Sequence, residues 1–293
     1  METINQSSAS GEILKGDRIV STVESLMNGK NNQKIIENLK MYRDTGRGSR
    51  VSIFHENIEE SEKTMVMAGA VYDKMKSLAE KTSETKKEYA FLVLGWTQGE
   101  NFLFNAIASD VDINEETKKA IYDKNPEWEA DDSAADFNVL LSVYWQAING
   151  HIDKMKASGL KPLVSLGHTH PNVSESYGNY SLPDLVGLSM QEETIRGNRD
   201  GDEVEYCHIV LPVNGDVDCM TFDKEAGRFK KVANVMSVGQ NGEDTVPAYT
   251  FESPKILSET SYVKEKNESE DDKLYDDCID EIIRKHQWDN MAE

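Results

Sequence analysis

The residues best suited to chemistry are two histidines, His168 and His170, in the segment GHTHP at the end of an expected strand. Alternate side chains of a β-strand point to the same face, so both imidazoles can reach one ion with little rearrangement. Imidazole is a ligand that zinc accepts well, and a catalytic zinc site combines three protein ligands with one open position. The pair therefore indicates a zinc site, although two strand histidines also fit ordinary surface positions.

A third ligand is expected from the segment that follows the histidines. Asp184 is the only aspartate between residues 154 and 198, and it stands in the sequence SLPD that opens the next expected helix. The same sequence is close to a capping box, with Ser181 as the N-cap and Asp184 in the first turn. The segment thus has a structural interpretation beside the metal-binding one.

Hydrophobic periodicity predicts the elements that would hold these residues. Unbroken apolar runs indicate buried strands at FLVLGW (91–96) and, across a Gly-containing turn, FLFNAIA (102–108). Apolar residues recur every three or four positions from Phe137 to Met155, which predicts the longest helix. Further strands are expected at LVSLGHTH, EYCHIVLPV, DVDCMTF and GRFKKVANVMSV, with a helix at SLPDLVGLSMQEETI.

Two elements are expected ahead of these. VSIF (51–54) is strand-like, and Val71, Met75 and Leu78 share one face of a helix that runs to about Thr85. The resulting fold class is α/β, with a mixed β-sheet sandwiched by helices. A doubly wound nucleotide-binding fold belongs to the same class, but neither of its phosphate-binding glycine patterns is present.

Glu88 completes a recognisable pattern. It enters the expected strand that reaches Gly95 seven residues later, and it precedes the HTHP and SLPD segments in the chain. Three motifs thus follow one another in the chain: a glutamate before a buried strand, then His-Ser/Thr-His-Pro, then Ser-x-x-Asp. In this order of motifs the sequence resembles the JAMM metallopeptidases, also called the JAB/MPN family, over roughly residues 51–237. The resemblance implies the JAB/MPN fold, which is cytidine deaminase-like.

The resemblance also implies a role for each residue of the pattern. His168, His170 and Asp184 would bind one Zn²⁺ ion, and the open position would hold a water whose pKa the ion lowers to ~7. Glu88 would be the general base, and Ser181 would donate a hydrogen bond to the tetrahedral oxyanion. The expected activity is that of a zinc peptidase or isopeptidase on a protein substrate, and the family implies conjugates of ubiquitin or a ubiquitin-like modifier.

Two alternatives stay open within the same resemblance. Many proteins of the family have lost the ligands and serve as inactive scaffold subunits, but here all five residues of the pattern are retained. A RadC-like protein is the second alternative, although that branch carries HNHP where this chain has HTHP. The loop 171–180 is longer than the family usually has, and its Tyr177 and Tyr180 suggest that it shapes substrate access.

The net charge of the chain indicates which classes of partner are disfavoured. The chain has 32 basic and 53 acidic residues, a net charge of −21, which disfavours nucleic acid and anionic membranes as partners. Segments 109–136 and 251–293 hold ten acids against three bases and thirteen against six, and they are interpreted as an acidic insertion and tail. Tyr122 and Trp128 of the insertion could add to a partner surface. The oligomeric state is left open.

Composition divides the chain into three parts. Residues 1–50 are expected to form a helical appendage whose first eleven residues are disordered, residues 51–237 the main domain, and residues 238–293 an acidic tail with a terminal helix. The apolar stripe of that helix is expected to dock on its own chain rather than on another protein. It consists of Cys278, Ile279, Ile282 and Ile283.

The remaining signals place the chain in the cytoplasm. No secretory signal and no apolar run of membrane-spanning length is visible, and three scattered cysteines do not suggest a disulfide framework. The cysteines are expected to be buried small hydrophobic residues. His55, His151 and His208 are assigned structural positions outside the metal site.

Overall fold

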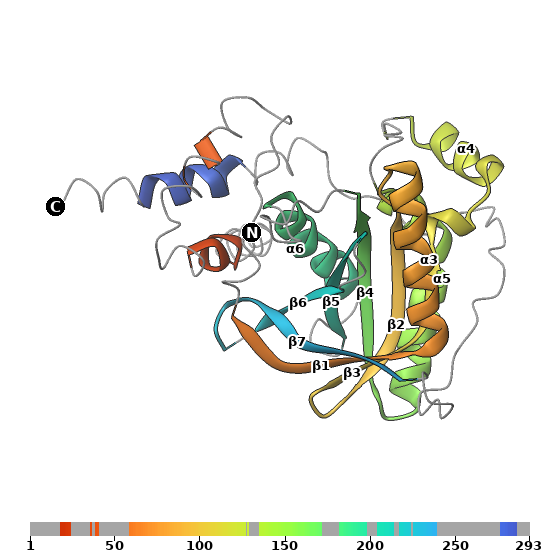
Figure 1. Ribbon diagram of the computed structural model, residues 1–293, viewed down its shortest axis with the longest axis horizontal. Helices are drawn as coiled ribbons and strands as arrows, with labels where there is room; N and C mark the ends of the chain where they lie inside the picture. The colour runs from red at the N-terminus through yellow and green to blue at the C-terminus, as the bar shows by residue number, and fades with distance from the viewer. Residues whose placement is uncertain are drawn as a thin grey trace, which may run out of the picture.

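Figure 1 shows the helices and strands of the protein in a computed structural model. The structure describes residues 18–24, 36, 39–40, 59–126, 128, 135–171, 182–197, 204–213, 217–223, 225–238 and 276–285. The strands are β1 (Glu60–Ala68), β2 (Ala90–Gln98), β3 (Asn101–Ser109), β4 (Lys161–His170), β5 (Glu205–Pro212), β6 (Asp218–Asp223) and β7 (Arg228–Val238). The main helices are α3 (Gly69–Thr85), α4 (Glu115–Lys124), α5 (Phe137–Ala157) and α6 (Leu182–Gly197), with a short 3-10 helix η2 (Asp110–Asp112).

These strands form one mixed sheet in the order β1-β3-β2-β4-β5-β6-β7. The sheet closes into a barrel because β1 pairs in parallel with both β3 and β7. The α/β class and the mixed sheet are confirmed, whereas the closure was not predicted. The strand responsible, β1, begins with the charged sequence ESEK and alternates too weakly to be recognised, and the strand expected at residues 51–54 lies outside the described residues.

Helices cover both faces of the sheet and divide the core in two. Helix α3 packs on one face, against apolar side chains of β1 to β5 that include Phe91 and Val93. Helices α5 and α6 pack on the other face, where Ala90, Leu92 and Leu94 point. Strand β2 is buried on both sides, which explains its unbroken apolar sequence.

Gly95 lies at an irregularity that requires a glycine. The β2–β3 register shifts between Leu94 and Gly95, and a Cβ at Gly95 would lie 1.8 Å from the backbone oxygen of Leu103. The Gly95 carbonyl accepts a hydrogen bond from His151 Nε2 of α5 at 2.6 Å. His151 thus has the structural position expected from the sequence, and burial lowers its pKa more than the Gly95 bond raises it.

The described residues of the acidic segment 109–136, which are 109–126, 128 and 135–136, pack on the domain. Ser109 and Asp112 form a capping box at η2, and Asn114 caps α4 by accepting from the Thr117 amide. Ile113, Ile121 and Trp128 belong to the same core cluster as α5. Trp128 is therefore not available for a partner surface, contrary to its assignment from the sequence.

The terminal segments contribute to the core beside α6. In residues 18–24 and 276–285, the side chains of Ile19, Val23, Ile279 and Ile282 are at most 2% exposed. Arg18 pairs with Glu192 of α6 at 3.1 Å, and Lys285 pairs with Glu24 at 2.9 Å. Docking on the same chain is therefore confirmed for the described residues of the C-terminal stripe.

Two further expectations can be compared with the described residues. Cys207, Cys219 and Cys278 are all buried, as expected, and none of the three forms a disulfide in the structure. No helix in the described ranges combines the length and the hydrophobicity needed to span a bilayer.

Asp110 is a buried carboxyl whose titration should appear in the stability of the fold. Its Oδ2 accepts a hydrogen bond from the Ala90 amide at 3.1 Å, and the residue is 4% exposed. Burial raises the pKa of Asp110 from 3.8 to about 6, against the lowering effects of the Ala90 bond and the Lys118 charge. Because the folded chain keeps the proton longer than the unfolded chain, the stability contributed by this group falls as pH rises from 3.8 to about 6.

Asp110→Asn should therefore stabilise the protein at neutral pH, by up to about 3 kcal/mol, and by much less near pH ~4. Urea unfolding at the two pH values measures the difference. Asp123→Asn, which alters an exposed carboxylate paired with Lys119, is the matched control and should change stability by less than ~1 kcal/mol at either pH. An equal effect of Asp110→Asn at both pH values would contradict the assignment.

Candidate metal centre

Strand β4 presents the two histidines between β2 and β5. His168 is in register with Ala90 of β2 and with Val210 of β5. The side chains of Ala90, Val210 and Leu166 all belong to the core on the α5–α6 side, so the alternation of the strand directs His168 and His170 to this side. The predicted arrangement of the pair on one strand face is confirmed.

Thr169, between the two histidines, anchors the motif on the opposite face. Its Oγ1 accepts a hydrogen bond from Thr82 Oγ1 of α3 at 2.6 Å and another from the Tyr89 amide at 2.9 Å. Its own amide donates to the Tyr89 carbonyl at 3.1 Å. These bonds tie the end of β4 to α3 and to the start of β2, which fixes the backbone on which both imidazoles stand.

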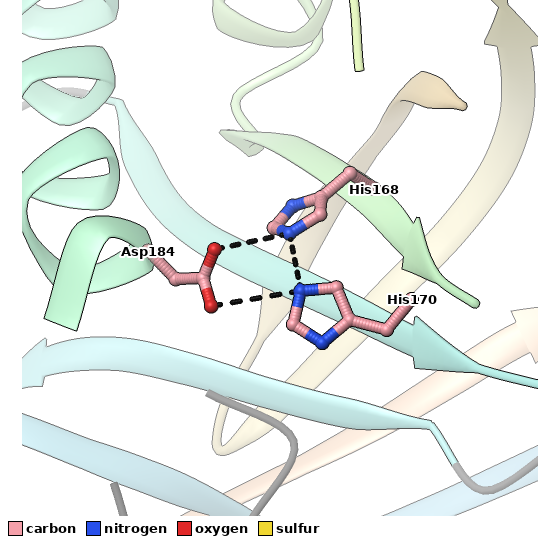
Figure 2. A group of neighbouring side chains, drawn as sticks. All are labelled: His168, His170 and Asp184. Carbon is pink, nitrogen blue, oxygen red and sulfur yellow. Dashed lines mark hydrogen bonds and ion pairs between the residues drawn. The ribbon is translucent and has the colours of Figure 1, made fainter. Parts of the chain in front are cut away.

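Asp184 of α6 completes the group, as Figure 2 shows. His168 Nε2 lies 2.8 Å from His170 Nε2 and 3.1 Å from Asp184 Oδ1, and His170 Nε2 lies 3.6 Å from Asp184 Oδ2. Ligands of a tetrahedral zinc with bonds of 2.0–2.1 Å are ~3.3 Å apart, which lies within this range of separations. The donor atoms are thus spaced as the ligands of one ion.

The electrostatics of the group formed by His168, His170 and Asp184 favour a bound cation. The three side chains are 6%, 12% and 11% exposed, so water screens their lone pairs poorly. Burial alone would raise the pKa of Asp184, but the charge and hydrogen bonds of His168, and then those of His170, hold it well below its ordinary value. A carboxyl group with a lowered pKa favours the ionised form that binds metal, and the buried group could hold a metal ion.

Of the two catalytic residues expected from the sequence, the structure describes Glu88 but not Ser181. Glu88 is partly buried and directly precedes Tyr89, whose backbone is hydrogen-bonded to Thr169 between the two histidines, and its role as a base remains a prediction. Ser181 and the loop residues 172–180 lie outside the described residues. The N-cap and oxyanion roles of Ser181 and the access role of the loop remain predictions.

His208 was assigned a position away from the site, and the structure corrects this. Its Nε2 lies 3.2 Å from Nδ1 of His168, on the side of that ring opposite the metal group. Its Nδ1 lies 3.1 Å from Oε1 of Gln191, which also accepts a hydrogen bond from the Tyr206 hydroxyl at 3.0 Å. The available sequence signal was that Tyr206 and His208 share one face of a strand, but nothing in the sequence placed that strand beside β4.

Burial keeps His208 neutral. The residue is 1% exposed, and burial, followed by the charge of His168, lowers its pKa to about 3. The Phe137 ring lies 5.9 Å from the His168 ring and 6.2 Å from the His208 ring, centroid to centroid. This aromatic side chain forms an apolar wall along the pair.

Comparison with known proteins does not assign the chain to a family. No family model and no curated protein matches the chain. Among solved structures, the chain is similar to the solution structure of protein DSY2949 from Desulfitobacterium hafniense, with 11% identity and a TM-score of 0.32 over 60% of this chain and 93% of that one.

The group should bind one divalent metal ion per chain, and its members should be required for that binding. His168→Ala and Asp184→Ala should each weaken binding by at least ~100-fold, because loss of a ligand exceeds the 10–100-fold effect typical of outer partners. Asp184→Ala should also lower the melting temperature of the metal-loaded protein, because it removes an acid from the first turn of α6.

Competition with a chromophoric chelator measures these affinities. His151→Gln replaces a part-buried histidine that bonds to Gly95 and not to the metal group, so it should retain wild-type affinity. Wild-type protein that takes up no stoichiometric metal after exposure to zinc, manganese, cobalt or iron would contradict the assignment.

Proposed function

We propose that this protein is a zinc-dependent peptidase or isopeptidase of the JAMM type. The observation that carries the proposal is the convergence of His168 Nε2, His170 Nε2 and Asp184 at separations of 2.8–3.6 Å. Two nitrogen donors and one carboxylate form a ligand set typical of catalytic zinc, which leaves a fourth position for a reactant. The same three residues carry the HTHP and SLPD parts of the family pattern.

Several features of the fold support the JAB/MPN assignment within the α/β class. The strand after Glu88 pairs antiparallel with the histidine strand, so sequence segments about 80 residues apart are adjacent at the site. Helix α5 separates them in the chain and packs on the face that carries the histidines. Gly95, the glycine of the family pattern, lies where a Cβ would clash with the neighbouring strand.

Each residue has a distinct task in this proposal. Bound zinc would supply Lewis acidity, which lowers the pKa of a coordinated water and polarises the scissile carbonyl. His168, His170 and Asp184 would hold the ion. Glu88 would accept the proton of the attacking water and deliver it to the leaving amine. Ser181 would donate a hydrogen bond to the oxyanion.

The substrate class follows from the resemblance and from charge. A protein conjugated through an isopeptide bond to ubiquitin or a ubiquitin-like modifier is the proposed substrate. The net charge of −21 favours a substrate with a basic surface and disfavours nucleic acid and anionic membranes. We place the activity in the cytoplasm.

Glu88→Gln should separate catalysis from metal binding. Glutamine keeps the size of the side chain but cannot accept the proton, so turnover should fall by ~100-fold or more while metal content stays at the wild-type level. Turnover is measured on a panel of isopeptide-linked modifier conjugates by intact mass, with metal content determined on the same samples.

Glu100→Gln is the matched control. Glu100 is an exposed glutamate in the turn after β2, at the end of that strand opposite Glu88, and its replacement should leave turnover unchanged. Metal-loaded Glu88→Gln protein with wild-type turnover would refute the role of Glu88. Metal-loaded wild-type protein that cleaves no conjugate or peptide would favour the inactive scaffold instead.

A further inference from the structure

We propose that His208, Gln191 and Tyr206 form a positioning chain that holds His168 in the ring orientation and tautomer needed to bind metal. The proposal rests on the metal site of the proposed function and adds residues that the family pattern does not contain. The chain runs from the Tyr206 hydroxyl to Gln191 Oε1 (3.0 Å), from Gln191 Oε1 to His208 Nδ1 (3.1 Å), and from His208 Nε2 to His168 Nδ1 (3.2 Å).

The direction of the hydrogen bonds follows from the chemistry of Gln191. A carbonyl oxygen only accepts, so the hydroxyl of Tyr206 and Nδ1 of His208 both donate to Oε1. With its proton on Nδ1, His208 has a lone pair on Nε2, and this lone pair accepts from Nδ1 of His168 at 3.2 Å. His168 in turn keeps its proton on Nδ1, so Nε2, the nitrogen that faces His170 and Asp184, is the atom free to give up its proton and bind a metal ion.

The opposite direction would be incompatible with metal binding. If the amide nitrogen of Gln191 faced His208, it would donate to Nδ1, and His208 would then donate from Nε2 to Nδ1 of His168. That arrangement would leave the proton of His168 on Nε2, the atom that lies 3.1 Å from Asp184 Oδ1. The carbonyl of Gln191 therefore selects the tautomer that can serve as a ligand.

Burial makes the loss of any of these hydrogen bonds costly. Tyr206 and His208 are each 1% exposed, and His168 is 4% exposed. Phe137 packs beside both imidazoles, so water cannot readily replace a lost partner, and an unsatisfied buried polar group is costly. Outer partners of this kind orient metal-binding histidines and raise their basicity.

Helix α6 links the positioning chain to the metal group. Asp184 and Gln191 are seven residues apart on α6, which places them on the same face two turns apart. Asp184 reaches the metal group directly, and Gln191 reaches it through His208. A single helix thus supplies one ligand and orients another.

The first test needs only the wild-type protein. In ¹⁵N NMR of metal-free protein with labelled histidines, at a pH of about 8, where an ordinary imidazole is neutral, the ring of His208 should be protonated at Nδ1 and not at Nε2. Protonation at Nε2 would overturn the proposal, because His208 would then be the donor.

The second test is metal affinity, measured with Co²⁺ and Zn²⁺ by chelator competition. Gln191→Met, which is nearly isosteric but removes the carbonyl, should weaken binding by ~10–100-fold, and so should His208→Phe. Gln191→Glu keeps both acceptor bonds and should retain strong binding. Tyr206→Phe removes one donor to the Gln191 carbonyl but keeps the hydrogen bond from His208 to it. It should therefore weaken metal binding less than Gln191→Met does.

Ser189→Ala is the matched control, because Ser189 is a buried residue of α6 that does not belong to the positioning chain. It should leave affinity unchanged. Wild-type affinity in folded Gln191→Met and His208→Phe proteins would overturn the positioning role alone, since the wild type would still bind metal. Absence of metal binding by the wild type would instead overturn the proposed function. Circular dichroism establishes folding, and the NMR result stands without any variant.

Discussion

The pairing of β4 between β2 and β5 is the constraint on which the site depends. This register puts His168 beside Ala90 on one side and Val210 on the other, and it puts Thr169 against the Tyr89 backbone. A slip of one residue would turn both imidazoles to the face packed on α3, because side chains alternate along a strand. The bonds from Thr82 and Tyr89 to Thr169 oppose such a slip at the end of the strand, where pairing is otherwise weakest.

A strand can present two ligands to an ion but cannot surround it, so the third must come from another layer. Helix α6 packs over β5 and supplies Asp184 from its first turn, where the helix dipole favours a negative charge. The position of α6 is set by buried contacts along its length. They include the ion pair of Glu192 with Arg18 at 3.1 Å. The segment 18–24 therefore helps to hold the helix that completes the metal group.

Polar groups in the core on the α5–α6 side require partners, and those partners link distant parts of the chain. The hydroxyl of Thr22 accepts a hydrogen bond from the Phe229 amide at 2.9 Å, and Tyr206 and His208 meet Gln191. Each bond satisfies a group that burial would otherwise penalise. The network therefore ties the N-terminal segment, α6 and strands β5 and β7 to one another around the site.

The sequence by itself determined the elements with strong periodicity and the candidate ligands with distinctive spacing. The apolar run of β2, the long repeat of α5 and the histidine pair could all be predicted, because each depends on neighbours in the chain. The structure alone decided the closure of the sheet by β1, the burial of Trp128 and the contact of His208 with His168. These depend on which strands become neighbours, and pairing between segments tens of residues apart leaves no local pattern in the sequence. The separations in the metal group were likewise set by packing of α6 on β5.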